Sequence, residues 1–143
     1  MYITTHLALG LIIGKLSGDY SAALIGSLAI DVDHLFPAIK ERRLFNIKEY
    51  WRRSRSYKDS NRSYFHGIFA LVFFSGILYL FDPRFAIIFA IAYLGHFLLD
   101  ALDNSDFMPF YPLTKLNIKG FIPYYSKQEL LFSLVLFLVF FIF

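Results

Sequence analysis

The sequence predicts an all-α fold, a small polytopic transmembrane helical bundle of about four to five helices. Of its 143 residues, 57% are hydrophobic and only 17% are charged, whereas soluble globular domains carry about 25% charged residues. The apolar residues form five uncharged runs that are too long and unbroken for alternating strands. Because the chain has no internal repeat and no low-complexity linker, we expect one membrane-embedded domain over residues 1–143.

The first two runs, Leu7 to Gly14 and Tyr20 to Ile30, are short for membrane crossings. A hydrocarbon core about 30 Å thick needs roughly 20 helical residues, since each adds about 1.5 Å. Gly18 lies between the two runs, and glycine adopts the left-handed backbone that tight turns need. We therefore expect a re-entrant hairpin or a tilted pair of helices at this place.

The third and fourth runs, Gly67 to Phe81 and Phe85 to Leu99, are predicted to form a helical hairpin. Asp82-Pro83 separates them, and proline is tolerated in a first helical turn while it disfavours helix in the residue before it. The fifth run, Leu130 to Phe143, is rich in Phe, Leu and Val, as a lipid-facing helix requires. The sequence leaves open about three to five full crossings, because the first pair and the last run are short.

Charge is concentrated in the segment from Lys40 to Arg62, which holds nine basic and three acidic residues. Basic residues next to membrane helices mark the cytoplasmic side. If the helices alternate, the N-terminus and the segment from Ala101 to Glu129 lie on that side too. The membrane itself is expected to be the inner or plasma membrane of the cell. The net charge is +3, but the apolar excess indicates anionic lipid headgroups as partners and argues against nucleic acid.

Each of the four histidines lies at or near the end of an apolar run. They are His6, His34, His66 and His96. Under the alternating topology these ends share one cytoplasmic layer, together with the carboxylates of Asp31, Asp33 and Asp100. The i, i+4 spacing of His96 and Asp100 places both side chains on one helical face. Because ionisable groups inside a membrane are costly, pairing or metal coordination is the default explanation of such a layer.

These seven side chains predict a divalent metal site. Imidazole and carboxylate ligands without sulfur suit zinc first, with manganese or iron as alternatives. Seven candidates exceed the ligands of one tetrahedral ion, so one or two ions are expected, and a bound ion that lowers the pKa of water predicts hydrolysis. The alternatives are a non-catalytic metal-binding or metal-transport membrane protein, and a structural membrane protein with an inert polar layer.

Several of these motifs also form a recognisable set: Thr5-His6, the Asp-x-Asp-His from Asp31 to His34, the helix end from Gly95 to Asp100, and Tyr111-Pro112-Leu113. The set resembles the small membrane-bound metal-dependent hydrolases of bacteria and archaea known as LexA-regulated inner-membrane proteins. A His-Arg-x-x-Thr-His-Ser stretch of that family aligns with Asn61 to Gly67. Arg62 and His66 match it, whereas Asn61, Phe65 and Gly67 depart from it. The His-x-x-x-Asp helix is also similar, less specifically, to that of zinc-dependent phospholipase C.

The layer predicts roles for individual residues. All seven side chains are candidate metal ligands, and Asp33 is also the candidate catalytic residue, either bridging two ions or acting as general base. Arg62 is the candidate substrate-binding residue, because its planar fork suits phosphate oxygens, although a charge that orients the protein explains it equally well. Since the layer lies at the membrane interface, the expected substrate is a phosphoester of a lipid or polyisoprenyl compound. The oligomeric state is not predicted.

Overall fold

The computed structural model of the chain describes residues 1–34 and 64–143, apart from the side chains of Asp33, His34 and Tyr64. Within these residues all regular elements are helical, and no strand is present. They are α1 (Ile3–Ser17), α2 (Tyr20–Leu28), the 3-10 helices η1 (Ala29–His34) and η3 (Tyr64–His66), α5 (Ile68–Phe81), α6 (Pro83–Leu102) and α7 (Lys127–Ile142). The prediction of an all-α fold with four to five helices is confirmed.

The turn between α1 and α2 forms at the glycine that predicts it. Gly18 has a φ of 76°, and its N–H donates to the Gly14 carbonyl oxygen at 2.9 Å. Asp19 then begins α2, because its side chain accepts a hydrogen bond from the N–H of Ala22 at 2.9 Å. A cap of this kind stabilises a helix by about 1 kcal/mol. The first two runs are therefore separate helices.

The turn between α5 and α6 follows the Asp82-Pro83 signal. The Asp82 side chain accepts a hydrogen bond from the N–H of Phe85 at 3.0 Å, and Pro83 is the first residue of α6. Proline fits this position because the first N–H groups of a helix have no partner inside it. The predicted helical hairpin is confirmed.

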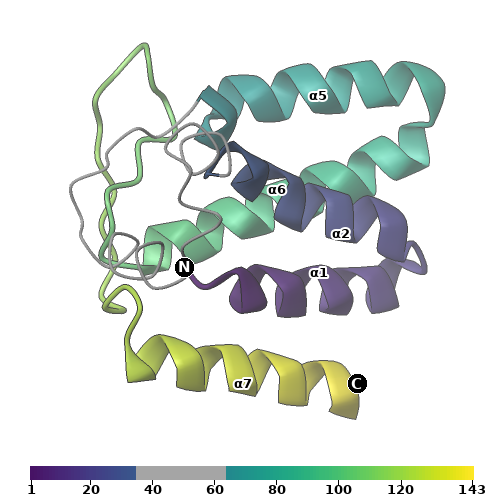
Figure 1. Cartoon of the computed structure of the whole chain (residues 1–143). Coiled ribbons are helices and arrows are strands. Elements are labelled where there is room, and N and C mark those ends of the chain that lie inside the picture. The colour runs from purple at the N-terminus through teal and green to yellow at the C-terminus, as the bar shows by residue number, and fades with distance from the viewer. Residues whose placement is uncertain (35–63) are drawn as a thin grey trace, which may run out of the picture.

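The helices run alternately in opposite directions, so their ends fall into two groups (Figure 1). One group holds the starts of α1, α5 and α7, the end of α6, and both 3-10 helices. We call it the histidine end, because His6, His66 and His96 lie there. The other end holds the two turns described above and Phe143.

Small residues let α1, α2 and α6 approach closely. A Cβ atom on Gly10 would lie 2.2 Å from Ser27 Oγ, and one on Gly26 would lie 2.4 Å from the Phe89 carbonyl oxygen. Ala22, Ala23 and Ala92 are fully buried between the helices. Because the backbones are this close, side chains from all three helices can meet at the histidine end.

Large apolar side chains cover the outer faces of α5 and α7. Exposed examples are Val72, Phe73, Leu80, Leu131, Leu134 and Phe141. Among the described residues, α6 alone is long and apolar enough to cross a membrane by itself, and its 20 residues span about 30 Å. The shorter apolar helical stretches are Ile3–Ser17, Tyr20–Val32, which runs from α2 into η1, and Ile68–Phe81. The number of crossings therefore stays a prediction.

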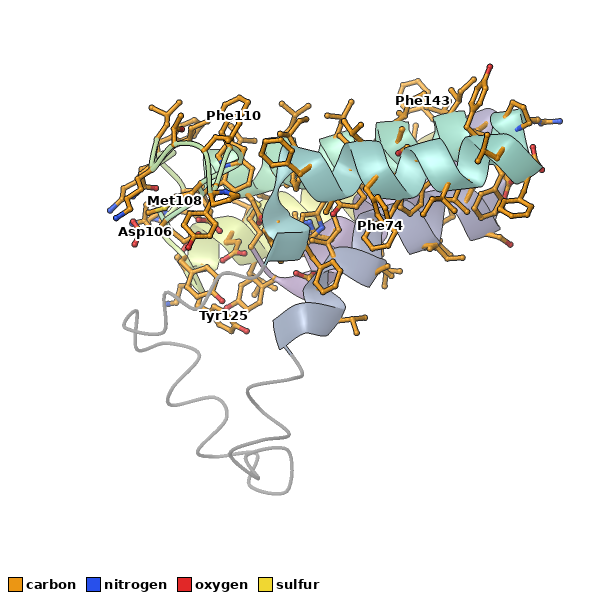
Figure 2. All side chains as sticks on the ribbon, turned by 90° about the horizontal axis from the view of Figure 1, so that it is seen from above. Phe74, Asp106, Met108, Phe110, Tyr125 and Phe143 are labelled. Atoms are coloured by element: carbon orange, nitrogen blue, oxygen red, sulfur yellow. The ribbon has the colours of Figure 1, made fainter. Side chains whose placement is uncertain are left out.

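Residues 103–126 form an irregular segment that packs against the histidine end. Two isolated bridges pair Asp103 with Ile122 and Phe107 with Ile118, and Gly120 lies against the last turn of α6. A Cβ atom on Gly120 would lie 2.1 Å from the Leu102 carbonyl oxygen, so only glycine fits there without a shift. Figure 2 shows Asp106, Met108, Phe110 and Tyr125 of this segment at the end of the molecule opposite Phe143.

Candidate metal centre

Three of the predicted ligands come from α1 and α6. His6 Nε2 lies 3.5 Å from Asp100 Oδ1, and His96 Nε2 lies 3.3 Å from Asp100 Oδ2. His96 and Asp100 are one helical turn apart, and their spacing brings them together as predicted. All three are buried, His6 and His96 almost completely.

Asp31 and His66 complete the cluster from the two 3-10 helices. Asp31 Oδ1 lies 3.7 Å from His66 Nε2 and 3.7 Å from His96 Nε2. His66 Nε2 also lies 3.8 Å from Asp100 Oδ2. The Tyr93 hydroxyl of α6 donates a hydrogen bond to the Phe65 carbonyl oxygen, which ties η3 to α6 beside His66. Five predicted ligands therefore meet at the histidine end.

A backbone contact sets the orientation of the His96 ring. His96 Nδ1 lies 2.7 Å from the Ser27 carbonyl oxygen, and a carbonyl only accepts, so Nδ1 carries a proton, and in the neutral ring Nε2 has the lone pair. Within the described residues, His96 Nε2 and both ring nitrogens of His6 are buried without a hydrogen-bond partner. An unpaired buried polar group costs about 1–3 kcal/mol, so these nitrogens indicate a ligand.

The distances between the ligand atoms are longer than typical hydrogen bonds and lie at or slightly above the spacing of ligands around a metal ion. Hydrogen bonds to oxygen span about 2.7–3.2 Å, whereas the five nitrogen–oxygen distances in the cluster are 3.3–3.8 Å. Bonds of about 2.0–2.2 Å around a tetrahedral ion place neighbouring ligands about 3.3–3.6 Å apart. Two overlapping groups could hold an ion: His6, His96 and Asp100, and Asp31, His66 and His96.

Asp103 extends this cluster by one helical turn. The Met1 amino nitrogen lies 3.1 Å from Asp100 Oδ1 and 2.7 Å from Asp103 Oδ2. Burial acts to lower the pKa of this amino group, but the charges of Asp100 and Asp103 outweigh it and raise the pKa to about 10. Asp103 is fully buried, and its Oδ1 accepts a hydrogen bond from the N–H of Ser105 at 2.5 Å. From the sequence alone, Asp103 is interpreted equally well as a residue that supports the ligands or as a solvated loop residue.

Comparison with known families establishes the membrane class. Over residues 1–143 the chain matches the family model described as YdjM inner membrane protein. The chain belongs to this family. The match supports the inner-membrane part of the resemblance and the predicted location, whereas its description names neither a hydrolase nor phospholipase C. The comparisons with curated proteins and with solved structures give no match.

The structure of this YdjM-family protein does not describe the side chains of three predicted site residues. Asp33 and His34 end η1, and only their backbone is described, while Arg62 lies outside the described residues. The whole basic segment from Lys40 to Arg62 lies outside them too. The ligand roles of Asp33 and His34, the catalytic role of Asp33 and the substrate-binding role of Arg62 stay predictions.

Sequence reasoning missed Glu129, which is fully buried at the start of α7. Its carboxylate accepts hydrogen bonds from the N–H groups of Tyr2 and Tyr125, the second at 2.6 Å. It thereby joins α7 to the residues that lead into His6. Ser126 Oγ accepts a hydrogen bond from the N–H of Glu129 at 3.1 Å. Ser-x-x-Glu before an apolar run is the capping-box pattern, which could have identified this residue.

Proposed function

We propose that this YdjM-family protein is a metal-dependent hydrolase of the inner membrane, acting on a phosphoester of a lipid or polyisoprenyl substrate. The observation that carries the proposal is the environment of His96 Nε2. This nitrogen is buried without a hydrogen-bond partner in the described part of the chain, 3.3 Å from Asp100 Oδ2 and 3.7 Å from Asp31 Oδ1. Zinc suits the ligand set first, and manganese or iron next.

A cation is needed between these atoms. Because His96 Nδ1 faces the Ser27 carbonyl, the neutral ring turns the lone pair of Nε2 toward two carboxylates, and lone pairs repel one another. Either a proton or a metal ion relieves this repulsion. His66 Nε2 approaches the same two carboxylates, and this second imidazole favours the metal ion. An inert polar layer would leave buried groups unpaired at a cost of about 1–3 kcal/mol each.

The arrangement favours hydrolysis over transport. A transport path needs ligands at several depths across the bilayer, whereas the five described ligands gather at the histidine end. A bound divalent cation would lower the pKa of a water molecule toward neutrality and so supply a nucleophile. In this proposal Asp33 acts as the general base and Arg62 holds an anionic oxygen of the substrate.

The surroundings of Asp31 favour a lipid-like substrate. Its side chain is the most exposed of the five ligands, at 18%, so a substrate reaches the centre past it. The neighbouring Val32 is exposed, and so is Phe65 beside His66. Apolar side chains at this approach suit an acyl or prenyl chain better than a fully hydrated substrate.

The same proposal includes a multi-pass topology with the histidine end at the cytoplasmic face. Alternating helices with exposed apolar outer faces support it, because such faces need lipid to cover them. The basic residues from Lys40 to Arg62 follow η1 in the sequence, and basic residues prefer the cytoplasmic side. Helix η1 itself lies at the histidine end. The centre would then lie at the depth of lipid headgroups.

The experiment loads detergent-purified protein with zinc and measures hydrolysis of a phospholipid, a polyprenyl phosphate and a generic phosphoester. Asp31→Asn should lose bound zinc and turnover together. Alanine at Asp33 or Arg62 should abolish turnover while sparing much of the metal binding. Zinc-loaded wild-type protein that cleaves none of the three substrates would refute the hydrolase.

Asp106→Asn is the matched control, since it is the same change in the nearby irregular segment. Asp106 contacts Lys119 Nζ at 2.8 Å and Asn117 Nδ2 at 2.6 Å, away from the cluster. Partly exposed ion pairs contribute about 0–1 kcal/mol, so this variant should keep both zinc and turnover. If wild-type protein retains no stoichiometric metal after loading, the inert polar layer is the better account.

A further inference from the structure

The rings of His6 and His96 are stacked, which limits what they can bind together. Their centroids lie 3.7 Å apart and their planes differ by 15°. An imidazole binds a metal through a lone pair that lies in the plane of its ring. An ion midway between the two rings would lie nearly 2 Å out of both planes, almost the full length of a metal–nitrogen bond of about 2.0–2.1 Å. The stacking therefore argues against one ion shared by His6 and His96, although their ligand atoms lie close enough together to hold one.

His66 and His96 have the opposite relation. Their planes meet at 65° with centroids 5.5 Å apart, so lone pairs in the two planes can converge on one point. Asp31 Oδ1 lies 3.7 Å from the Nε2 atom of each ring. His66, His96 and Asp31 thus form one coherent ligand set, which leaves His6 outside it.

Asp100 faces both sides with different oxygen atoms. Its Oδ2 lies 3.3 Å from His96 Nε2 and 3.8 Å from His66 Nε2, whereas its Oδ1 lies 3.5 Å from His6 Nε2. A carboxylate with each oxygen turned to a separate imidazole set has the arrangement of a bridging ligand. The sequence predicts a bridging role or a general-base role for Asp33, whereas the geometry of the described residues favours Asp100 as the bridge.

The His6 side of Asp100 already holds a cation. The Met1 ammonium nitrogen lies between Asp100 Oδ1 and Asp103 Oδ2, at 3.1 Å and 2.7 Å. Both ring nitrogens of His6, whose Nε2 lies 3.5 Å from the same Asp100 Oδ1, are buried and, among the described residues, lack any hydrogen-bond partner. Asp100 Oδ1 thus lies between an unpaired imidazole and the ammonium that contacts Asp103.

We infer that His6, Asp100 Oδ1 and Asp103 form a second divalent-cation site, joined through Asp100 to the site of Asp31, His66 and His96. The inference rests on the proposed function, because it adds a second ion to the same centre. One imidazole and two carboxylates suit zinc, manganese or iron. The ion displaces the Met1 ammonium from the two oxygens. Paired ions stabilise both the attacking and the leaving oxygen in phosphoester cleavage, which agrees with the proposed substrate class.

Counting metal ions tests the inference. Detergent-purified protein is dialysed against excess manganese and then against metal-free buffer, and bound manganese per chain is measured by mass spectrometry. We expect two ions in the wild type, one in Asp103→Asn and two in the control Asp106→Asn. One ion in the wild type that Asp103→Asn leaves unchanged would overturn the second site, because the ammonium alone then balances the two carboxylates. No ion in the wild type would instead overturn the proposed function.

A spectroscopic measurement on the wild type keeps the test valid if Asp103→Asn does not fold. Two manganese ions joined by a carboxylate are magnetically coupled, so the electron paramagnetic resonance spectrum of the loaded protein should differ from that of isolated Mn²⁺. In folded Asp103→Asn the spectrum should revert to the six-line pattern of a single ion. A six-line spectrum from fully loaded wild-type protein would contradict the bridged pair.

Discussion

Gly26→Ala should weaken both the fold and the proposed metal centre. The added methyl carbon would lie 2.4 Å from the Phe89 carbonyl oxygen, and real Cβ contacts are essentially never shorter than 3.0 Å. Helix α2 must therefore move from α6 by at least 0.6 Å, the difference between these two distances. Forced overpacking of this kind costs about 1–3 kcal/mol. At roughly 4 °C per kcal/mol for a chain of this size, Tm should fall by about 4–12 °C.

The same displacement reaches the ligands. Ser27 follows Gly26 directly and holds the His96 ring, while Asp31 lies a few residues further along the same segment. Metal–ligand distances tolerate only about 0.2 Å, so a shift of half an ångström should lower zinc affinity by roughly tenfold or more. The assay is thermal unfolding in detergent by circular dichroism, with and without zinc, and zinc affinity by competition with a chelator.

Gly76→Ala is the matched control, since nothing lies within 4 Å of the added methyl group. Alanine is up to about 1 kcal/mol more favourable than glycine inside a helix. This variant should therefore keep its zinc affinity and melt at the same or a slightly higher temperature. Equal melting temperatures and equal zinc affinities for the two variants would refute the close α2–α6 packing and its link to the centre.

Three further predictions concern the centre and its supports. Tyr93→Phe removes the hydroxyl that holds the Phe65 carbonyl beside His66, so zinc affinity should fall about 10–100-fold with an unchanged helical circular dichroism spectrum; unchanged affinity would show that this bond does not position His66. A chelator should destabilise the zinc-loaded protein, and free zinc at a hundred times its Kd should restore about 2.7 kcal/mol; a Tm insensitive to zinc would contradict a built site. Gly120→Ala places a methyl carbon 2.1 Å from the Leu102 carbonyl oxygen and should cost about 1–3 kcal/mol in urea unfolding; a cost below 0.5 kcal/mol would argue against the packing of the irregular segment on α6.

The helices could be predicted because their signals are local. Gly18 and Asp82-Pro83 mark the two turns through the backbone preferences of single residues, and both turns form at these places. The convergence of His6, His66 and His96 also follows from the sequence, since alternating helices place every second run end in the same layer. Neither inference needs side-chain packing, which is why pattern and topology suffice.

The fate of the acidic residues after α6 could not be predicted in the same way. Asp103 and Asp106 occupy the same polar stretch of sequence, yet Asp103 is fully buried and Asp106 pairs with Lys119 near the surface. The difference arises from long-range packing, because the Gly120 N–H donates to the Asp103 carbonyl oxygen at 2.7 Å and brings the returning chain against α6. A contact between residues so far apart in sequence leaves no local pattern.

The ring geometry of the histidines is equally beyond the sequence. The spacing of His96 and Asp100 predicts that they share a helical face, but the stacking of His6 on His96 depends on the distance between α1 and α6. That distance is set by small residues such as Gly95, where an added Cβ would lie 2.7 Å from Leu9 Cδ2. The proposal of two ions therefore depends on the packing of the helices, which the sequence does not reveal.

X-ray absorption at the zinc edge of the loaded, detergent-purified protein tests the central claim, a metal centre of imidazole and carboxylate ligands, most directly. The account predicts a first shell of nitrogen and oxygen at about 2.0–2.2 Å, with outer-shell scattering from imidazole rings that weakens in His96→Ala. Zinc surrounded by oxygen alone, without imidazole scattering, would contradict it.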